Sequence, residues 1–172
     1  MIIYHDLLSD GEMFSDSFKV IKVNDFIWEV EGKSITVKEG VDGALLGANP
    51  SAEEAEEVED GVITVIDLVY AHQLQESSPG SKKYYMDFLK DYLKKLKTKM
   101  EADKVDETTI AKFMKESQAY VKEKLLADFN NLTFYQPKTS SDEFYFIPMN
   151  YRDDESTPYF VFFANGLKEE KV

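Results

Sequence analysis

Cysteine is the residue type that this 172-residue chain lacks altogether. Its absence excludes disulfide bridges, thiolate nucleophiles and the cysteine-based zinc sites. Histidine is scarce as well, since only His5 and His72 occur, each in a segment with strand character. Neither has a second His at metal-ligand spacing. A hydrogen-bonded or surface histidine is therefore favoured over a zinc ligand at both positions.

Long apolar runs and catalytic motifs are also missing. No window approaches the roughly 18–20 apolar residues of a membrane span, and residues 1–6 lack the basic and apolar regions of a signal peptide. We therefore expect a cytoplasmic location. There is no Gly-x-Ser-x-Gly turn, and the Gly-Lys-Ser/Thr of a phosphate-binding loop does not follow Gly43 and Gly47. With no nucleophile in view, the chain is predicted not to be an enzyme.

Charge is unbalanced in sign and in position. The chain holds 33 Asp and Glu against 20 Lys and Arg, a net charge of −13. A chain this acidic is expected to be repelled by nucleic acids and anionic membranes. Residues 82–104 are the exception, with 8 Lys against 4 acids. This basic segment is either the solvated side of an amphipathic helix or a contact site for an acidic partner.

The 12 Phe and 10 Tyr are enough to build a buried core. A Gly-containing connection at 31–33 predicts a hairpin between two of the strands, and Asn165-Gly166 predicts another. The polar segment 9–17 is expected to be a loop. Apolar and aromatic runs predict strands at residues 2–5, 18–23, 26–30, 34–38, 62–67 with continuation through 68–74, 132–135, 144–147, 159–163 and 167–171.

Two amphipathic helices are predicted between these groups of strands. The first carries one apolar stripe from Tyr84 to Met100 and begins after Ser78 or Ser81. The second has Asp106 as its N-cap and a buried face from Ile110 to Leu125. Their short connection predicts an antiparallel helical hairpin. The fold class is therefore α+β, with strands from both ends of the chain building a sheet around the inserted hairpin.

Residues 40–61 interrupt the pattern with glycines and with six acids between 51 and 60. Little apolar area is available there to offset the cost of ordering the backbone, so we expect a mobile loop. The acids are candidate calcium ligands. Because no EF-hand pattern organises them, weak calcium binding at best is expected, and a merely solvated acidic loop is the favoured alternative.

Six sequence blocks, spread over the whole chain in order, resemble the translationally controlled tumour protein family. The blocks are Met-Ile-Ile-Tyr-His-Asp at 1–6, Glu-Met-Phe-Ser-Asp at 12–16, Gly-Ala-Asn-Pro-Ser-Ala-Glu at 47–53, Asn-Tyr-Arg-Asp-Asp at 150–154, Thr-Pro-Tyr at 157–159 and Asn-Gly-Leu-Lys-Glu-Glu-Lys at 165–171. The resemblance implies one domain with a β-tent core at 1–39, 62–76 and 131–172 and a helical hairpin at 79–129. The tent is shared with a chaperone of nucleotide-free Rab GTPases.

The resemblance also implies sites, carried over by position. Glu12 and Leu74 correspond to a surface proposed to face a Rheb-type small GTPase. Asn49, Ser51 and Glu53 belong to the family signature, and a weak calcium site is placed near Asn49. The family's tubulin-binding region overlaps the helical hairpin, and the lysines expected to face that partner are Lys90, Lys94 and Lys97.

The function implied is that of a cytoplasmic regulatory binding protein, partly associated with the cytoskeleton. Family members are linked to microtubules, calcium, growth and protein synthesis through elongation factors, and protection from cell death through anti-apoptotic proteins. Guanine-nucleotide exchange on a small GTPase is the alternative. The sequence departs from the family pattern at two places. Gln136-Pro137-Lys138 stands where the family usually has Gly-Glu, so a base replaces an acid there. Val172 stands where many animal members have a terminal cysteine, so a disulfide-linked dimer is excluded and a monomer is expected.

Overall fold

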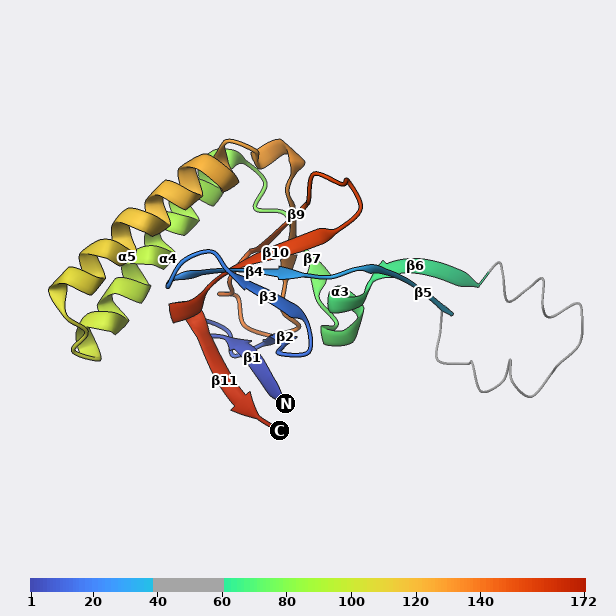
Figure 1. Cartoon of the computed structure of the whole chain (residues 1–172), viewed down its shortest axis with the longest axis horizontal. Coiled ribbons are helices and arrows are strands. Elements are labelled where there is room, and N and C mark those ends of the chain that lie inside the picture. Colours follow the sequence, from blue (N-terminus) through green and yellow to red (C-terminus); the bar gives the residue numbers. More distant parts are fainter. Residues whose placement is uncertain (39–60) are drawn as a thin grey trace, which may run out of the picture.

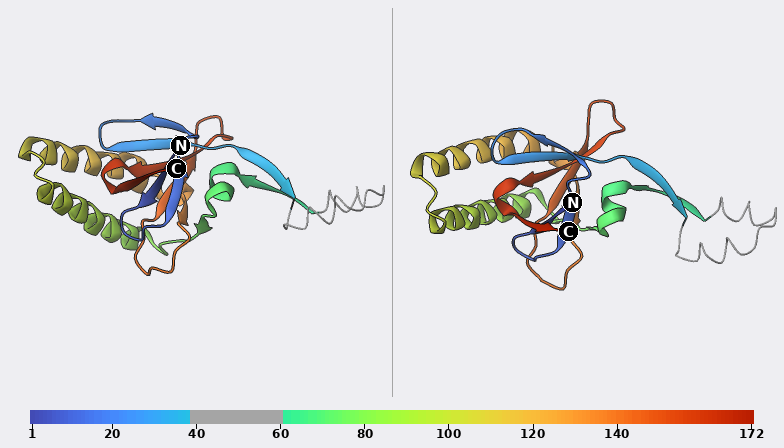
Figure 2. Two further views of the ribbon diagram at one scale, coloured as in Figure 1. Left: turned by 90° about the horizontal axis from the view of Figure 1, so that it is seen from below. Right: turned by 60° about the horizontal axis from the view of Figure 1, so that its bottom comes forward.

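The computed structural model describes residues 1–38 and 61–172. A β body lies at the centre, the pair of long helices α4 and α5 lies on one side, and the two-stranded β5–β6 ribbon projects from the other (Figure 1). The views in Figure 2 show the same arrangement from two further directions. The α+β class predicted from the sequence is confirmed. No helix among the described residues is long and apolar enough to cross a membrane.

The two ends of the chain meet in a three-stranded sheet. Strand β1 (Ile2–Asp6) pairs antiparallel with β11 (Leu167–Lys171) on one side and with β2 (Glu12–Ser15) on the other. The N–H of Val172 donates to the Met1 carbonyl at 2.9 Å. The loop predicted over residues 9–17 is wrong for β2. Most residues of this segment are polar, but Met13 and Phe14 are buried, being 1% and 0% exposed.

A six-stranded sheet forms the centre of the molecule. It combines strands from the first and last parts of the chain, as the sequence predicted, and every pairing in it is antiparallel. Its order is β3 (Lys19–Lys22), β4 (Ile27–Glu31), β10 (Pro158–Phe163), β9 (Ile147–Tyr151), β8 (Thr133–Gln136) and β7 (Gln75–Glu76).

Both predicted β-hairpins are wrong. Both edges of β4 are already paired, with β3 and β10, so β5 (Ser34–Lys38) leaves the sheet and pairs with β6 (Val62–Ile66) instead. Gly32 allows this departure, since a Cβ there would lie 2.8 Å from an Asp67 carboxylate oxygen. At the second position the short 3₁₀ helix η3 (Ala164–Gly166) carries the chain from β10 into the other sheet.

The strand predicted over 68–74 is also wrong. The chain forms helix α3 (Asp67–His72), whose buried residues Leu68 and His72 are four positions apart. The Asp67 carboxylate accepts the Lys33 backbone N–H at 2.9 Å and so ties the start of α3 to the ribbon. Gln73 ends the helix with a left-handed φ of 54°. A single apolar helical turn is too short for its period to be distinguished from that of a strand.

The two long helices are confirmed with their N-caps. Helix α4 (Lys82–Ala102) begins at Ser81, whose hydroxyl accepts the Tyr84 N–H. Helix α5 (Glu107–Tyr120) begins at Asp106, whose carboxylate accepts the Thr109 N–H at 3.0 Å. The chain then continues as the π-helix η1 (Val121–Leu126), a wider turn that the sequence did not indicate.

Aromatic side chains attach α4 to the β body. Tyr92 is 2% exposed and stacks on Tyr145 with ring centroids 4.9 Å apart, and its ring meets Phe163 edge-on at 5.8 Å. Burial, together with the charge of Asp6, holds the pKa of Tyr92 well above its usual range, so its hydroxyl stays neutral. Contacts of this kind add about 0.5–1.5 kcal/mol each to the gain from apolar burial.

A polar cluster attaches α5. The Tyr120 hydroxyl donates to the Glu29 carboxylate on β4 at 2.5 Å, and burial together with that bond raises the pKa of Tyr120. Arg152 bridges Glu29 at 2.5 Å and Glu31 at 2.9 Å, with its guanidinium 4.0 Å from the Tyr159 ring centroid. The helical hairpin is thus fixed to the sheet through both of its helices.

Gly166 provides a direct test of how α4 docks. A Cβ at this position would overlap the Tyr92 hydroxyl, so Gly166→Ala is expected to lower the free energy of unfolding by about 1–3 kcal/mol in urea denaturation. In a Tyr92→Phe background the same change is expected to cost clearly less, because the obstructing oxygen is gone. Tyr85→Phe, which removes a different buried hydroxyl, should leave the cost unchanged. An equal cost in all three backgrounds would contradict the described contact.

Candidate functional site

The lysines predicted to face a partner lie on the side of α4 away from the sheet. Lys90 and Lys94 are exposed and Lys97 is half-buried. None of the three forms an ion pair with any described carboxylate, whereas Lys95, on the same helix, pairs with Asp91 and Glu143. The structure therefore brings the three predicted lysines together on one face and leaves their charge unneutralised within residues 1–38 and 61–172.

These lysines border a groove between α4 and the α5–η1 segment. The groove has a volume of about 750 Å³. Its lining is apolar at the floor and cationic at the rim, where Lys122 of η1 joins the three lysines of α4. The floor is formed by Met86, Leu89, Leu93, Met114, Val121 and Leu126. The sequence had indicated the lysines but not the groove, since helix–helix spacing is not encoded in the period of either helix.

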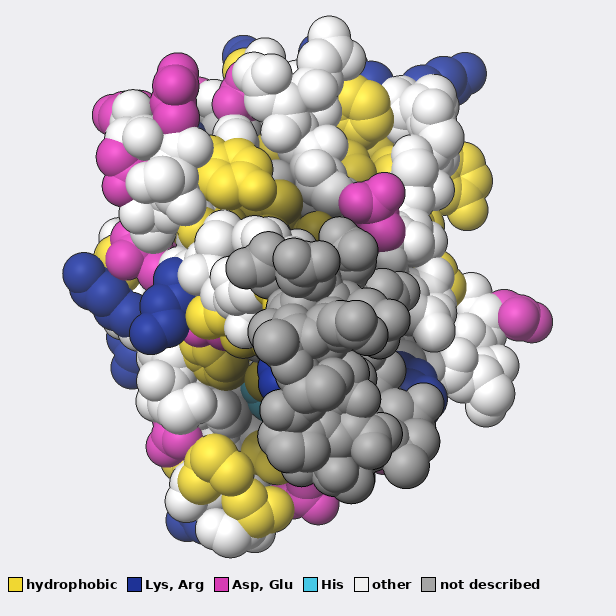
Figure 3. Space-filling model, turned by 90° about the vertical axis from the view of Figure 1, so that its right-hand side faces the viewer, with side chains coloured by type: hydrophobic (Ala, Val, Ile, Leu, Met, Phe, Trp, Pro, Cys, Tyr) yellow, Lys and Arg dark blue, Asp and Glu magenta, His cyan; other side chains and the backbone are white. Residues whose placement is uncertain are grey.

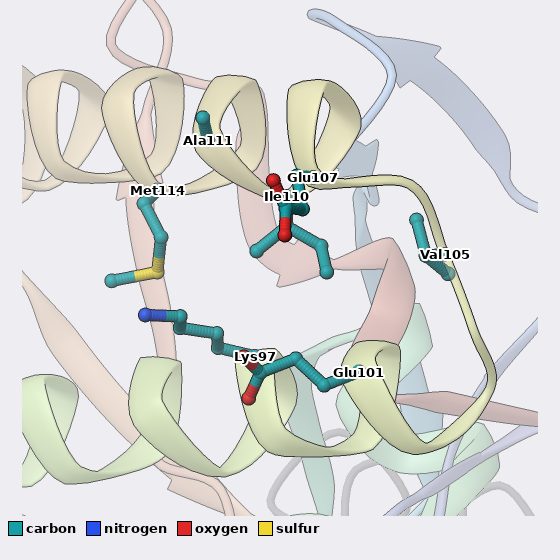
Figure 4. A pocket seen from close by; sticks show the side chains of 7 residues that line it. All are labelled: Lys97, Glu101, Val105, Glu107, Ile110, Ala111 and Met114. Carbon is teal, nitrogen blue, oxygen red and sulfur yellow. The ribbon is translucent and has the colours of Figure 1, made fainter.

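A second hollow of about 580 Å³ continues toward the tip of the hairpin. Lys97 reaches from α4 toward Met114 on α5, and both residues line the two hollows (Figure 4). Glu101 and Glu107 line the tip, so the cationic character of the groove ends there. The groove thus has a basic part and an acidic end.

The residues expected to face a GTPase lie together at a different place. Glu12 on β2 accepts a hydrogen bond from His72 Nδ1 on α3 at 2.5 Å. The His72 side chain is 6% exposed and that of Glu12 is 41% exposed. Leu74, two residues after His72, is 7% exposed, so it contributes to the core beneath this surface more than to the surface itself.

The divergent block at 136–138 lies beside Glu12. A Cβ on Gly11 would be 2.7 Å from Pro137, and the Lys138 ammonium donates to the Gln73 side chain at 3.0 Å. The lysine that replaces an acid therefore lies against the end of α3, next to His72. On the end of the molecule that carries the β5–β6 ribbon, apolar side chains are visible at several places among polar and charged ones (Figure 3).

The two histidines do not form one site. His5 lies on β1, where it bonds the Asp10 carbonyl at 2.9 Å and the Glu170 carboxylate at 3.0 Å. Burial alone lowers the pKa of His5, but these two bonds outweigh it and leave the pKa raised. Among the described residues no three His, Asp or Glu side chains are grouped so as to hold a metal ion. Asn49, Ser51 and Glu53, with the predicted calcium site, lie outside the described residues.

Comparison with known proteins places this geometry in a family. A sequence model described as "Translationally controlled tumour protein" matches residues 1–168. The chain belongs to the translationally controlled tumour protein family. Homologues in *Yarrowia lipolytica* and *Homo sapiens* are 41% and 40% identical, with at least 99% of each chain covered. The resemblance seen in the sequence blocks is thereby confirmed.

Two solved structures of family members share the fold. The *Schizosaccharomyces pombe* translationally controlled tumour-associated protein is 38% identical, with a TM-score of 0.79 and full coverage of both chains. The *Caenorhabditis elegans* protein is 32% identical, with a TM-score of 0.71, and the match covers 100% of this chain and 99% of that one. These likenesses confirm the fold that the family resemblance implied.

One residue of the Glu12 surface escaped sequence reasoning. His72 was assigned to a strand, and nothing in its sequence neighbourhood pairs it with Glu12, sixty residues earlier. Its Nε2 has no hydrogen-bond partner among the described residues, so the bond to Glu12 is the one that the described structure gives this buried ring.

Removal of the Glu12 carboxylate should therefore destabilise the fold. Glu12→Ala leaves a desolvated imidazole without its bond and is expected to lower the free energy of unfolding by about 1–3 kcal/mol. Glu12→Gln should cost less, because its amide oxygen still accepts from Nδ1–H. Exposed Glu169, mutated to Ala, is the matched control and should change stability by less than about 0.5 kcal/mol. A Glu12→Ala variant as stable as this control would show that the bond contributes nothing.

Proposed function

We propose that this member of the translationally controlled tumour protein family is a cytoplasmic, non-enzymatic binding protein that associates with microtubules through α4. The observation that supports this most is the row Lys90, Lys94 and Lys97, three cations without carboxylate partners among the described residues of a chain whose net charge is −13. An acidic polymer surface is the natural complement of such a row. A regulatory role in growth and protein synthesis would follow from this association with microtubules.

Charge reversal along this row tests the proposal. The triple variant Lys90→Glu, Lys94→Glu, Lys97→Glu should bind taxol-stabilised microtubules about tenfold more weakly in pelleting assays, because each rim ion pair contributes up to about 1 kcal/mol and reversal adds repulsion. The binding of the unmutated protein should fall as salt rises.

A matched control separates position from net charge. The control Lys82→Glu, Lys115→Glu, Lys124→Glu changes the net charge of the hairpin by the same amount at exposed lysines that line neither hollow. This control should keep most of its binding. Equal losses in the two triple variants would mean that only the net charge matters, and unchanged pelleting of the first would contradict the helix-face proposal.

A second candidate function is exchange or chaperoning of a Rheb-type small GTPase. It is favoured by one feature: Glu12 and His72 form one hydrogen-bonded surface, with Leu74 packed beneath it. Such a protein would act by binding the nucleotide-free GTPase, with no covalent step of its own.

Release of labelled GDP from a Rheb-type GTPase distinguishes this candidate. Glu12→Gln is the informative variant, since it removes the charge while keeping an acceptor for His72. The unmutated protein should accelerate release, and Glu12→Gln should reduce the acceleration by up to about fivefold, the contribution of one rim ion pair. An unmutated protein that leaves the release rate unchanged would end this candidate.

A further inference from the structure

The groove between α4 and the α5–η1 segment has the chemistry of a peptide-binding site. Its floor is apolar, and several of its members are only partly covered: Met86, Met114 and Leu126 are half-buried in spite of their apolar side chains. Methionine suits such a surface, because its flexible, polarisable side chain adapts to different apolar partners. An apolar floor of this kind is not needed for a purely electrostatic contact with a polymer surface.

The length of the groove matches about three turns of a helix. From Met86 to Lys97 it follows α4 over 11 residue steps, or about 16 Å at about 1.5 Å per residue. Three helical turns cover that length, and apolar anchors at positions i, i+3, i+7 and i+10 of an amphipathic helix span nearly all of it. A third helix laid here would pack against both helices of the hairpin.

The rim selects the charge of the occupant. Lys90, Lys94 and Lys97 lie along one wall and Lys122 on the other, and none has a carboxylate partner among the described residues. An occupant with acids on both sides of its apolar stripe would meet ammonium groups on both walls. Toward the tip, Glu101 and Glu107 would repel further acids, so the acidic part of the occupant is limited to the part of the groove that the lysines border.

The backbone is altered at the same place. Three of the lining residues, Val121, Lys122 and Leu126, belong to the π-helix η1. π-Helical segments are rare and occur frequently at functional sites. Here the segment forms part of the wall opposite α4.

From these observations we propose that the groove binds an acidic amphipathic α-helix of a partner protein. The inference goes beyond microtubule association, because it requires the apolar floor as well as the lysines. Peptide binding in the groove and microtubule association can therefore fail independently of each other.

The probe is a fluorescent, acetylated peptide of about 16 residues with leucines at i, i+3, i+7 and i+10 and Glu or Asp flanking them over its first three turns. A peptide of identical composition with its leucines spread around the helix is the control ligand. The full-length protein should bind the amphipathic peptide at least about tenfold more tightly than the control, as measured by fluorescence anisotropy. Equal affinity, or no binding up to about 1 mM, would overturn the proposal.

Protein variants locate the site. Met86→Gln, Met114→Gln, Leu126→Gln keeps good helix formers of similar length at half-buried positions and should weaken peptide binding about tenfold while leaving microtubule pelleting intact. The Lys90, Lys94, Lys97 reversal should weaken both, and the Lys82, Lys115, Lys124 reversal should weaken neither by more than about twofold. Circular dichroism and urea denaturation establish that each variant is folded.

Retained peptide binding in a folded floor variant would overturn the proposal. Another possible occupant of the groove is a second copy of the chain, and sedimentation velocity tests for it. A concentration-dependent dimer that the floor variant converts to a monomer would show that a second copy fills the groove and would likewise overturn the proposal. A monomer at all concentrations, together with the peptide results above, supports it.

Discussion

The packing of Tyr92 against Tyr145 and Phe163 fixes the rotation of α4 about its own axis, and the character of the exposed surface follows from that rotation. At about 100° per residue, Lys90 and Lys94 lie about 160° from Tyr92 around the helix and Lys97 about 140°, so all three face away from the sheet. Lys95 lies only about 60° from Tyr92, on the side where it meets Glu143. The buried face of α4, on which Tyr92 lies, therefore determines that Lys95 meets Glu143 while Lys90, Lys94 and Lys97 point away from the sheet.

The same docking explains why the groove persists as an open feature. Helix α4 is fixed through its aromatic face, and α5 is fixed independently through Tyr120 and the Glu29–Arg152 cluster. Because each helix has its own attachment to the sheet, the separation between their outer faces is set by the sheet and not by contact between the helices alone. An apolar floor can then stay partly exposed without the helices closing over it.

Sequence reasoning succeeded where the signal is local. The apolar stripe of α4 and the capping residues Ser81 and Asp106 are contained within one segment each, and the structure confirms them. The pairing of segments that lie far apart in the chain could not be predicted from such local signals. The Asn165-Gly166 dipeptide carries a strong local turn signal, yet it lies in η3, which carries the chain from one sheet into another. Strand β2 was missed because only two of its four residues, Met13 and Phe14, are apolar, and α3 because one turn shows no usable period.

For the candidate sites the same limit applies. The lysine row was visible as a basic segment in an acidic chain, since charge is read residue by residue. The bond between Glu12 and His72 joins residues that only the tertiary fold brings together, and the groove depends on the distance between two helices and on the π-helical turn of η1. Neither the contact between Glu12 and His72 nor the spacing of the two helices is a property of any one segment.

Strand β1 has consequences for how the molecule is made. Its partner β11 is the last strand of the chain, so a nascent polypeptide emerging from the ribosome cannot complete the three-stranded sheet until residues 167–171 have been synthesised. The helical hairpin, built from neighbouring residues, is able to form much earlier. During that interval the backbone N–H and C=O groups along one edge of β1 have no partner strand, and an unpaired strand edge is a place where another chain can pair and start aggregation.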